Sequence, residues 1–396
     1  MPDGSKPEAG LPAPKRRDVR LDFFRGIGMF IIFIAHVPRN PWNDWIPARF
    51  GFSDATEVFV FCSGMASAIA FASVFERYGF RLGLARVVYR CWQVYWCHIG
   101  LFLTAVALMV GADHVFGTGA QFVTSLSLNR FLGPDTGAAI LGLFTLTYVP
   151  HLFDILPMYL VALALLPVVM LLATVGPPIA LLFSVLLWCI AWYGGFNFSA
   201  EPWEDRTWFF NPLAWQLVFF TGFAFVRGWL PAPPIDRRLV AVAAAVVLVI
   251  IPFAHPWGIA ALPERFLVPH ALVDKTSLGP LRTVHFLALA YLAYAAAGVR
   301  GANLRGPIVA VCCKVGQQSL AVFVSGIIFS LMGGIALALN GYTIAMVTVV
   351  NLCGFAGLIA VAYVVGWFKS KPWGVKHAVA SRTNVARSLA PSQAAE

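Results

Sequence analysis

The segment TIAMVTVVNLCGFAGLIAVAYVVGW, residues 343–367, contains no charged side chain over 25 residues. A helix that crosses the hydrocarbon core of a bilayer needs roughly 20 apolar residues, so this segment is long enough to span. Inside hydrocarbon every backbone N–H and C=O group must be bonded within the segment, which an α-helix achieves. The segment therefore predicts a transmembrane helix.

The rest of the chain repeats this pattern. Hydrophobic residues make up 59% of the sequence and charged residues only 12%, whereas soluble domains carry about 25% charged residues. Nine further apolar segments lie at 20–37, 54–75, 86–110, 152–174, 179–195, 212–230, 239–254, 283–298 and 307–330. The sequence predicts an all-α, polytopic integral membrane protein with about ten transmembrane helices and no soluble domain.

The 28 Lys and Arg residues are distributed unevenly under this arrangement. Nineteen fall on one side of the membrane, seven on the other, and Arg25 and Lys314 lie within spans. Because basic residues gather on the cytoplasmic side, both termini are predicted to be cytoplasmic. The same sorting explains the net charge of +10 without nucleic acid as a partner.

Three regions are expected along the chain. Residues 1–18 are polar and proline-containing, which predicts a disordered cytoplasmic tail. Residues 19–368 form the transmembrane domain, and residues 369–396 form a second cytoplasmic tail. The long outer loops are predicted at 111–151, with an interfacial or re-entrant stretch at 138–149, and at 255–282.

The first predicted span carries ionisable side chains, which usually mark function inside a membrane. Arg25 and His36 are eleven residues apart, so both lie on one face of the helix, roughly 16 Å apart along its axis. One face thus presents a cation toward the cytoplasm and an imidazole toward the outside. The alternative is an arginine that extends to the inner interface and a histidine at the outer one.

Two further clusters are expected at the same outer depth. Asp54 and Glu57 share a face at the start of the second span, where they could orient His36 or simply cap the helix. His151 and Asp154 open the fourth span in the same way, with interfacial anchoring as the alternative. Additional polar candidates on the outer side are Tyr159, Gln216, Arg282 and His285.

Several kinds of catalytic motif are absent from the sequence. It holds no Gly-x-Ser-x-Gly elbow, no phosphate-binding glycine loop and no metal-spaced set of His, Glu or Cys residues. A serine hydrolase is therefore disfavoured, and no metal is expected. What remains is an imidazole near carboxylates at the outer face, with an arginine below it.

At these residues the sequence resembles the OpgC proteins, membrane succinyltransferases of osmoregulated periplasmic glucans that are related to the acyltransferase-3 membrane family. The resemblance covers roughly residues 18–370. It rests on the Arg25–His36 spacing and on the motifs RLDFFRG (20–26), GFSDATEVFVF (51–61), DILPMY (154–159), NPLAWQ (211–216) and GQQSLAVF (316–323). It implies acyl transfer from cytoplasmic acyl-CoA to a sugar hydroxyl in the periplasm, in a bacterial inner membrane.

Together the residues and the resemblance predict a mechanism. Arg25 lines the path of the succinyl-CoA arm, and His36 acts as general base on a glucan hydroxyl. Asp54 or Glu57 orients the imidazole. The remaining contacts to substrate are assigned to Tyr159 or Gln216 as oxyanion donor, to Arg282 or His285 for the succinyl carboxylate, and to His151 and Asp154.

Two alternatives stay open at this point. Intramembrane charges also fit a secondary transporter, although such folds often show internal repeats and midplane sites, and neither is evident here. An acetyl donor would need the same base and oxyanion donor as a succinyl donor. The glucan structure, the oligomeric state and the existence of a covalent acyl-enzyme are not determined by the sequence.

Overall fold

The computed structural model describes residues 18–374, and this part of the chain is helical apart from its loops and one isolated β-bridge. The all-α class is confirmed. The helices are α1 Val19–His36, α2 Ala55–Ser67, α3 Ser73–Phe116, α4 Gln121–Ser125, α5 Thr136–Thr145, α6 Ile155–Val175, α7 Pro177–Trp192, α8 Pro212–Arg227, α9 Arg237–Ala254, α10 Pro256–Ala261, α11 His270–Val273, α12 Pro280–Ala297, α13 Pro307–Gln317, α14 Ser319–Asn340 and α15 Ile344–Lys369.

Within the described residues, five helical segments are long and apolar enough to cross a membrane. They are the continuous run Ala55–Phe116, α6, α9, α14 and α15. Shorter apolar helices are α5, α7, α8 and α13. The chain is thus a multi-helix membrane protein, while the count of ten spans and the side on which the termini lie remain predictions.

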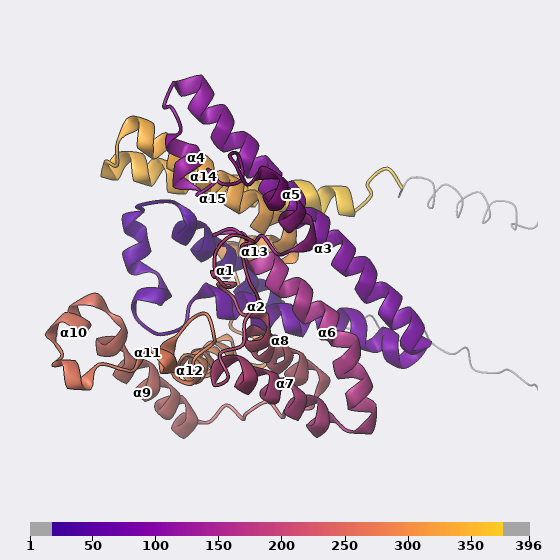
Figure 1. Ribbon diagram of the computed structural model, residues 1–396. Helices are drawn as coiled ribbons and strands as arrows, with labels where there is room; N and C mark the ends of the chain where they lie inside the picture. The colour runs from indigo at the N-terminus through magenta and orange to yellow at the C-terminus, as the bar shows by residue number, and fades with distance from the viewer. Residues whose placement is uncertain (1–17, 375–396) are drawn as a thin grey trace, which may run out of the picture.

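The run Ala55–Phe116 changes direction at Gly79. Its 62 residues would measure about 93 Å as one straight helix, roughly three times the hydrocarbon thickness. Gly79 has a φ of 81° and a ψ of 172°, in the region that favours glycine. Figure 1 shows the two arms that meet there, and they contain the predicted segments 54–75 and 86–110.

The predicted single span at 307–330 is wrong. One helix, α13, ends at Gln317, and another, α14, begins at Ser319. The amide side chains at the break bond neighbouring helices: Gln317 donates to Asp22 Oδ2 at 3.2 Å, and Gln318 Oε1 accepts from Lys369 Nζ at 2.7 Å. The apolar pattern runs through this break, so the pattern alone did not reveal it.

Glycines bring two pairs of helices into backbone contact. A Cβ atom added at Gly26 of α1 would lie 1.9 Å from the Cys312 carbonyl oxygen of α13. In the α2–α8 pair, a Cβ at Gly64 would lie 1.8 Å from the Phe219 oxygen. Small residues permit such close packing of membrane helices. Both crossings fix the position of the segments that carry the candidate site.

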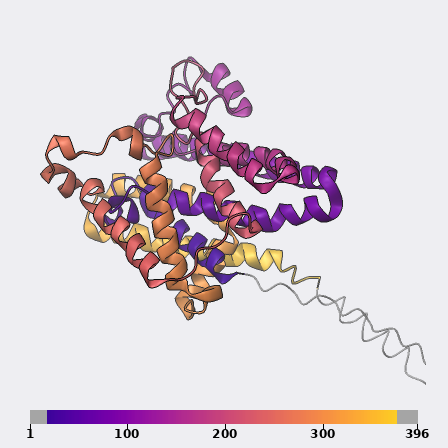
Figure 2. The same ribbon diagram turned by 90° about the horizontal axis from the view of Figure 1, so that it is seen from below.

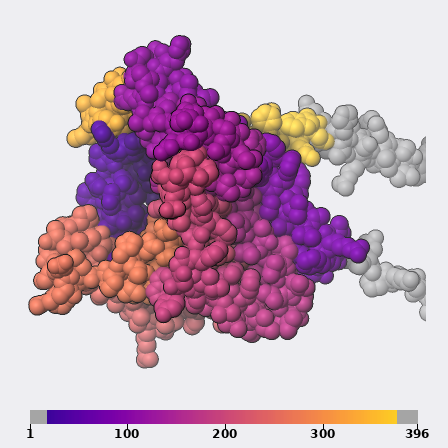
Figure 3. Space-filling model, viewed as in Figure 1, coloured from indigo at the N-terminus to yellow at the C-terminus, as the bar shows by residue number. Residues whose placement is uncertain are grey.

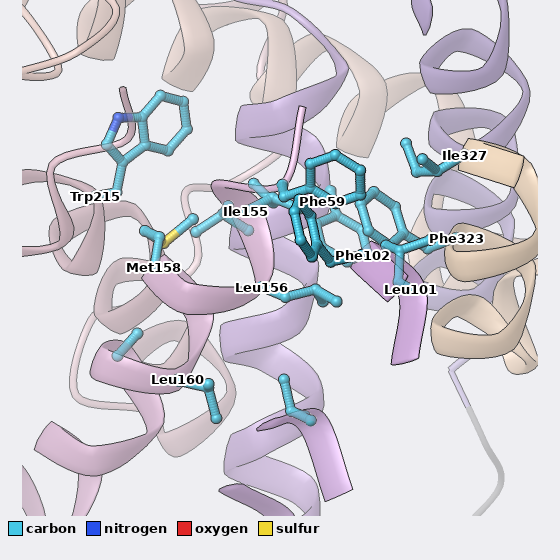
Figure 4. Packing of buried hydrophobic residues seen from close by; sticks show 14 of the residues in the cluster. Phe59, Leu101, Phe102, Ile155, Leu156, Met158, Leu160, Trp215, Phe323 and Ile327 are labelled. Atoms are coloured by element: carbon cyan, nitrogen blue, oxygen red, sulfur yellow. The ribbon is translucent and has the colours of Figure 1, made fainter. Parts of the chain in front are cut away.

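The central helices are enclosed by others. In Figure 1, α1, α2 and α13 lie at the centre of the bundle, whereas α9 and α10 lie at its edge. The view from below confirms the peripheral place of the segment that contains α9 and α10 (Figure 2). Figure 4 shows the core beside α2, where Phe59 stacks on Phe323 of α14 with ring centroids 5.7 Å apart.

Other expectations concern the loops and the tails. The stretch 138–149, expected to be interfacial or re-entrant, contains the end of the ten-residue helix α5 and the turn after it. The expected tails at 1–18 and 369–396 fall almost wholly outside the described residues, since residues 1–17 and 375–396 are not described.

Candidate active site

A cavity of about 450 Å³ lies at the His36 end of α1. Its lining comes from the end of α1, the segment that follows it, the first turns of α2 and α6, and two distant loops. In Figure 3 the N-terminal segment, in indigo, is seen between the purple and orange segments. The predicted site residues that line this cavity are His36, Asp54, His151 and Asp154.

The ring of His36 is held by its own helix. Its Nδ1 atom lies 2.7 Å from the Ile32 carbonyl oxygen. Because a carbonyl can only accept, Nδ1 carries the proton of the neutral ring and Nε2 carries the lone pair. The half-buried imidazole thus has a fixed tautomer and a basic nitrogen that is not used by this bond.

Asp54 and Glu57 form a capping box at the start of α2. Asp54 Oδ1 accepts from the Thr56 backbone N–H at 2.7 Å, and Glu57 Oε2 accepts from the Asp54 N–H at 2.8 Å. The capping role that the sequence allowed is therefore present. The recorded hydrogen bond of His36 goes to Ile32, so the role of Asp54 or Glu57 in orienting His36 stays a prediction.

The same two carboxylates are neutralised by two cations. Arg282 Nη2 lies 3.3 Å from Asp54 Oδ2, and Arg282 Nε donates to Glu57. Lys275 Nζ pairs with Asp54. Glu57 is fully buried and Arg282 is 6% exposed, so this network lies in surroundings where an unpaired charge is costly. Lys275 also lines the cavity.

Sequence reasoning missed Lys275 as a site residue. Its position follows from tertiary contacts: Trp215 Nε1 donates to the Lys275 carbonyl at 2.9 Å, and Trp188 Nε1 donates to the Leu278 carbonyl at 2.9 Å. The Lys275 ammonium lies 5.5 Å from the centre of the Phe210 ring. A lysine between prolines in a long outer loop gives no sequence signal of such a place.

The turn that carries Lys275 is fixed locally by Asp274. Its carboxylate accepts from the Ser277 backbone N–H at 2.7 Å and from the Ser277 hydroxyl at 2.6 Å. Burial raises the pKa of Asp274, but these hydrogen bonds outweigh burial and hold this pKa below its usual range. The turn therefore keeps its anchor at neutral pH.

The start of α6 contributes the other pair of predicted residues. Asp154 is 2% exposed, and its Oδ1 accepts from the Phe209 backbone N–H at 3.3 Å. His151 lies in the preceding turn and is exposed. Both line the same cavity as His36, although 115 residues separate His36 from His151.

Four predicted residues lie outside this cavity lining. The Gln216 amide is bonded to Ser184 of α7, through its Oε1 at 2.6 Å and its Nε2 at 2.7 Å. Tyr159 packs against the Phe219 ring at 6.0 Å. His285 Nδ1 accepts from the Ser53 backbone N–H at 3.2 Å. With the paired Arg282, these side chains build the frame around the cavity.

Arg25 lies about three helical turns below His36 on α1. Its Nη2 donates to the Ser319 hydroxyl at the start of α14. Its Nε is buried and has no hydrogen-bond partner in residues 18–374. The break between α13 and α14 thus faces the cation of α1. In the same described range, no group of His, Cys, Asp and Glu is placed to hold a metal ion.

The comparisons with known proteins agree with the resemblance seen in the motifs. The sequence profile of the OpgC protein family matches residues 17–370. No curated protein and no solved structure matches the chain. This family implies an acyltransferase with an acyl donor, suggests a succinyltransferase role on osmoregulated periplasmic glucans, and suggests the bacterial inner membrane. The match covers nearly the whole chain, which therefore belongs to the OpgC family.

Proposed function

We propose that this protein transfers a succinyl group from cytoplasmic succinyl-CoA to hydroxyl groups of periplasmic glucans, with His36 as general base. Family membership supports the class of reaction. The observation that carries the role of His36 is its geometry: Nδ1 is bonded to Ile32, which leaves Nε2 basic in a cavity that also holds a lysine.

In the proposed step, His36 Nε2 takes the proton of a glucan hydroxyl. The oxygen then attacks the thioester carbonyl, a C–O bond forms and the C–S bond breaks. CoA leaves as a thiolate, which recovers the proton from the imidazolium. General base catalysis of this kind contributes roughly 10²–10⁴ in rate. The Ile32 carbonyl supports it by stabilising the Nδ1–H of the imidazolium.

The oxyanion that forms during attack needs a donor, and we assign this contact to Lys275. An ammonium donates charge-assisted hydrogen bonds, which are stronger than neutral ones. One of the three Nζ protons is used by Asp54, and the Lys275 side chain is 30% exposed. Because Asp54 and Arg282 hold each other, the ammonium keeps a fixed position at the cavity wall.

The free carboxylate of a succinyl group needs a second cation, and Arg49 lines the cavity as well. Its ion pair with Asp44 is long, at 3.6 Å, and both side chains are at least 40% exposed. Exposed pairs contribute little, so a carboxylate can replace Asp44 as the partner. An acetyl donor would leave Arg49 without this contact, which favours succinyl over acetyl transfer.

The test uses purified protein in lipid nanodiscs with radiolabelled succinyl-CoA and unsubstituted glucan as acceptor. His36→Ala should lower transfer at least 100-fold, whereas His255→Ala, at a histidine outside the cavity lining, should leave it unchanged. Arg49→Gln should lower kcat/KM for succinyl-CoA more than for acetyl-CoA. Near-normal transfer by a folded His36→Ala variant would refute the proposed base.

A further inference from the structure

A second cavity, of about 260 Å³, opens beside the first. It lies between the chain that precedes α6 and the segment 199–207. His151 lines both cavities, so the two spaces meet at this residue. No role in acyl transfer has been given to the other residues of the second cavity.

Aromatic side chains form part of its lining. Tyr148 is 2% exposed, and its ring centre lies 5.2 Å from that of Trp203, with an angle of 47° between the ring planes. Tyr148 is also stacked on Phe131 at 6.0 Å. Trp203 is half-buried and tilted away from this stack. Such rings offer a rigid apolar face together with polar tips.

The charged residues of the cavity are paired with one another. Arg206 pairs with Glu201, and Arg130 lies 3.7 Å from Glu204. Two guanidinium groups thus meet two carboxylates in one lining. The cavity carries no net charge and instead offers planar donors and acceptors in pairs, which suits a neutral ligand with many hydroxyl groups.

The frame of this cavity is built from backbone hydrogen bonds. The Ala200 N–H donates to the Arg206 carbonyl at 2.7 Å, and the Val149 N–H donates to the Ala200 carbonyl at 2.8 Å. Arg206 Nη2 donates to the Val149 carbonyl at 2.7 Å. The segment 199–207 is therefore tied to the chain that leads directly to His151. A preformed site of this kind loses little entropy when a ligand binds.

We propose that this second cavity binds the acceptor glucan through sugar units next to the one that is acylated. This inference rests on the proposed function for the identity of the acceptor. The Trp203 ring packs against the apolar face of a pyranose, and Glu204 and Arg130 bond its hydroxyls. The neighbouring unit then presents its hydroxyl past His151 to His36.

The acyl donor is the other substrate that could occupy this cavity, and the charge pattern argues against it. Phosphate groups need unpaired cations, whereas the carboxylates of Glu201 and Glu204 would repel them. Partial burial and the nearby Arg206 guanidinium lower the pKa of His151 below its ordinary value. The imidazole is then neutral at pH 7, so it can bond a hydroxyl but adds no charge for an anion.

The experiment compares two acceptors in the nanodisc assay: unsubstituted glucan and methyl glucoside, which fills one sugar site only. Trp203→Ala and Glu204→Gln should each raise KM for glucan about tenfold with little change in kcat, because they remove binding that is uniform through the reaction. Neither should change KM for methyl glucoside or for succinyl-CoA. Asp205→Asn and Trp257→Ala, at residues outside both linings, are the matched controls.

Direct binding separates this proposal from the proposed function. Calorimetric titration of glucan into the His36→Ala variant should show binding that weakens about tenfold on addition of Glu204→Gln. This result would support the glucan subsite even if His36 were not the base. Unchanged glucan affinity in both the Trp203→Ala and Glu204→Gln variants, or an equal loss for methyl glucoside, would overturn the subsite and leave the proposed function standing.

Discussion

Arg282 offers the sharpest test of how the site is held together. The buried network contains two carboxylates, Asp54 and Glu57, and two cations, Arg282 and Lys275. Arg282→Met removes one cation and leaves the network with an excess negative charge around a fully buried Glu57. Breaking a buried ion pair by removing one partner costs about 3–5 kcal/mol. We expect a loss of this size in the free energy of unfolding.

A second variant distinguishes charge balance from simple loss of packing. Glu57→Gln keeps an oxygen that can accept from the Asp54 N–H, so the capping box survives. Combined with Arg282→Met it restores charge balance, because Lys275 remains to neutralise Asp54. The double variant should therefore be more stable than Arg282→Met alone, by roughly 1–3 kcal/mol of coupling between the two sites.

The measurement is equilibrium unfolding of the purified protein in mixed detergent micelles, carried out on the wild type, both single variants and the double variant. Arg227→Met is the control, because Arg227 pairs with Glu76, whose side chain is 48% exposed, and exposed pairs contribute about 0–1 kcal/mol. Additive losses in the double variant, or a loss below about 1 kcal/mol for Arg282→Met, would refute the reasoning.

Three further outcomes are expected. Gly64→Val should destabilise the protein by more than 1 kcal/mol in the same unfolding assay, because its Cβ would meet the Phe219 oxygen at 1.8 Å, whereas Gly100→Ala, where nothing lies within 4 Å, should change stability by less than about 1 kcal/mol. Reporter fusions at residue 270 and at the C-terminus should give opposite signals, and matching signals would contradict the predicted topology. Arg25→Ala should weaken succinyl-CoA binding in filter-binding assays without changing glucan affinity, and an unchanged donor affinity would return Arg25 to a structural role.

Much of the bundle could be predicted because its signal is local. Runs of apolar residues predict helices wherever they occur, and the arginines around Gly79 mark the reversal between two of them. The break between α13 and α14 left no such mark, because the residues on both sides of Gln318 are apolar. There the polar amides bond α1 and α15, and only the three-dimensional arrangement shows that these partners exist.

The candidate site divides in the same way. His36 and Asp54 could be placed together because one short loop separates the two helices that carry them. Lys275 could not, since 221 residues separate it from Asp54 and its loop is held by indole N–H groups from α7 and α8. Arg282 was recognised as a useful cation, but sequence gave no means of knowing that buried carboxylates already occupy it.

The two ends of α1 face different requirements, and the structure suggests how one helix meets both. At one end His36 has a fixed tautomer and opens into the cavity. About 16 Å away along the axis, Arg25 keeps a buried Nε–H without a partner in the described chain. A buried donor of this kind favours a ligand that supplies an acceptor, because leaving it unbonded costs free energy. Under the proposed function, an amide carbonyl in the arm of acyl-CoA is such an acceptor. The arm would then be bound at Arg25 while its thioester reaches His36, so the position of α1 against α13 sets the distance at which donor and acceptor meet.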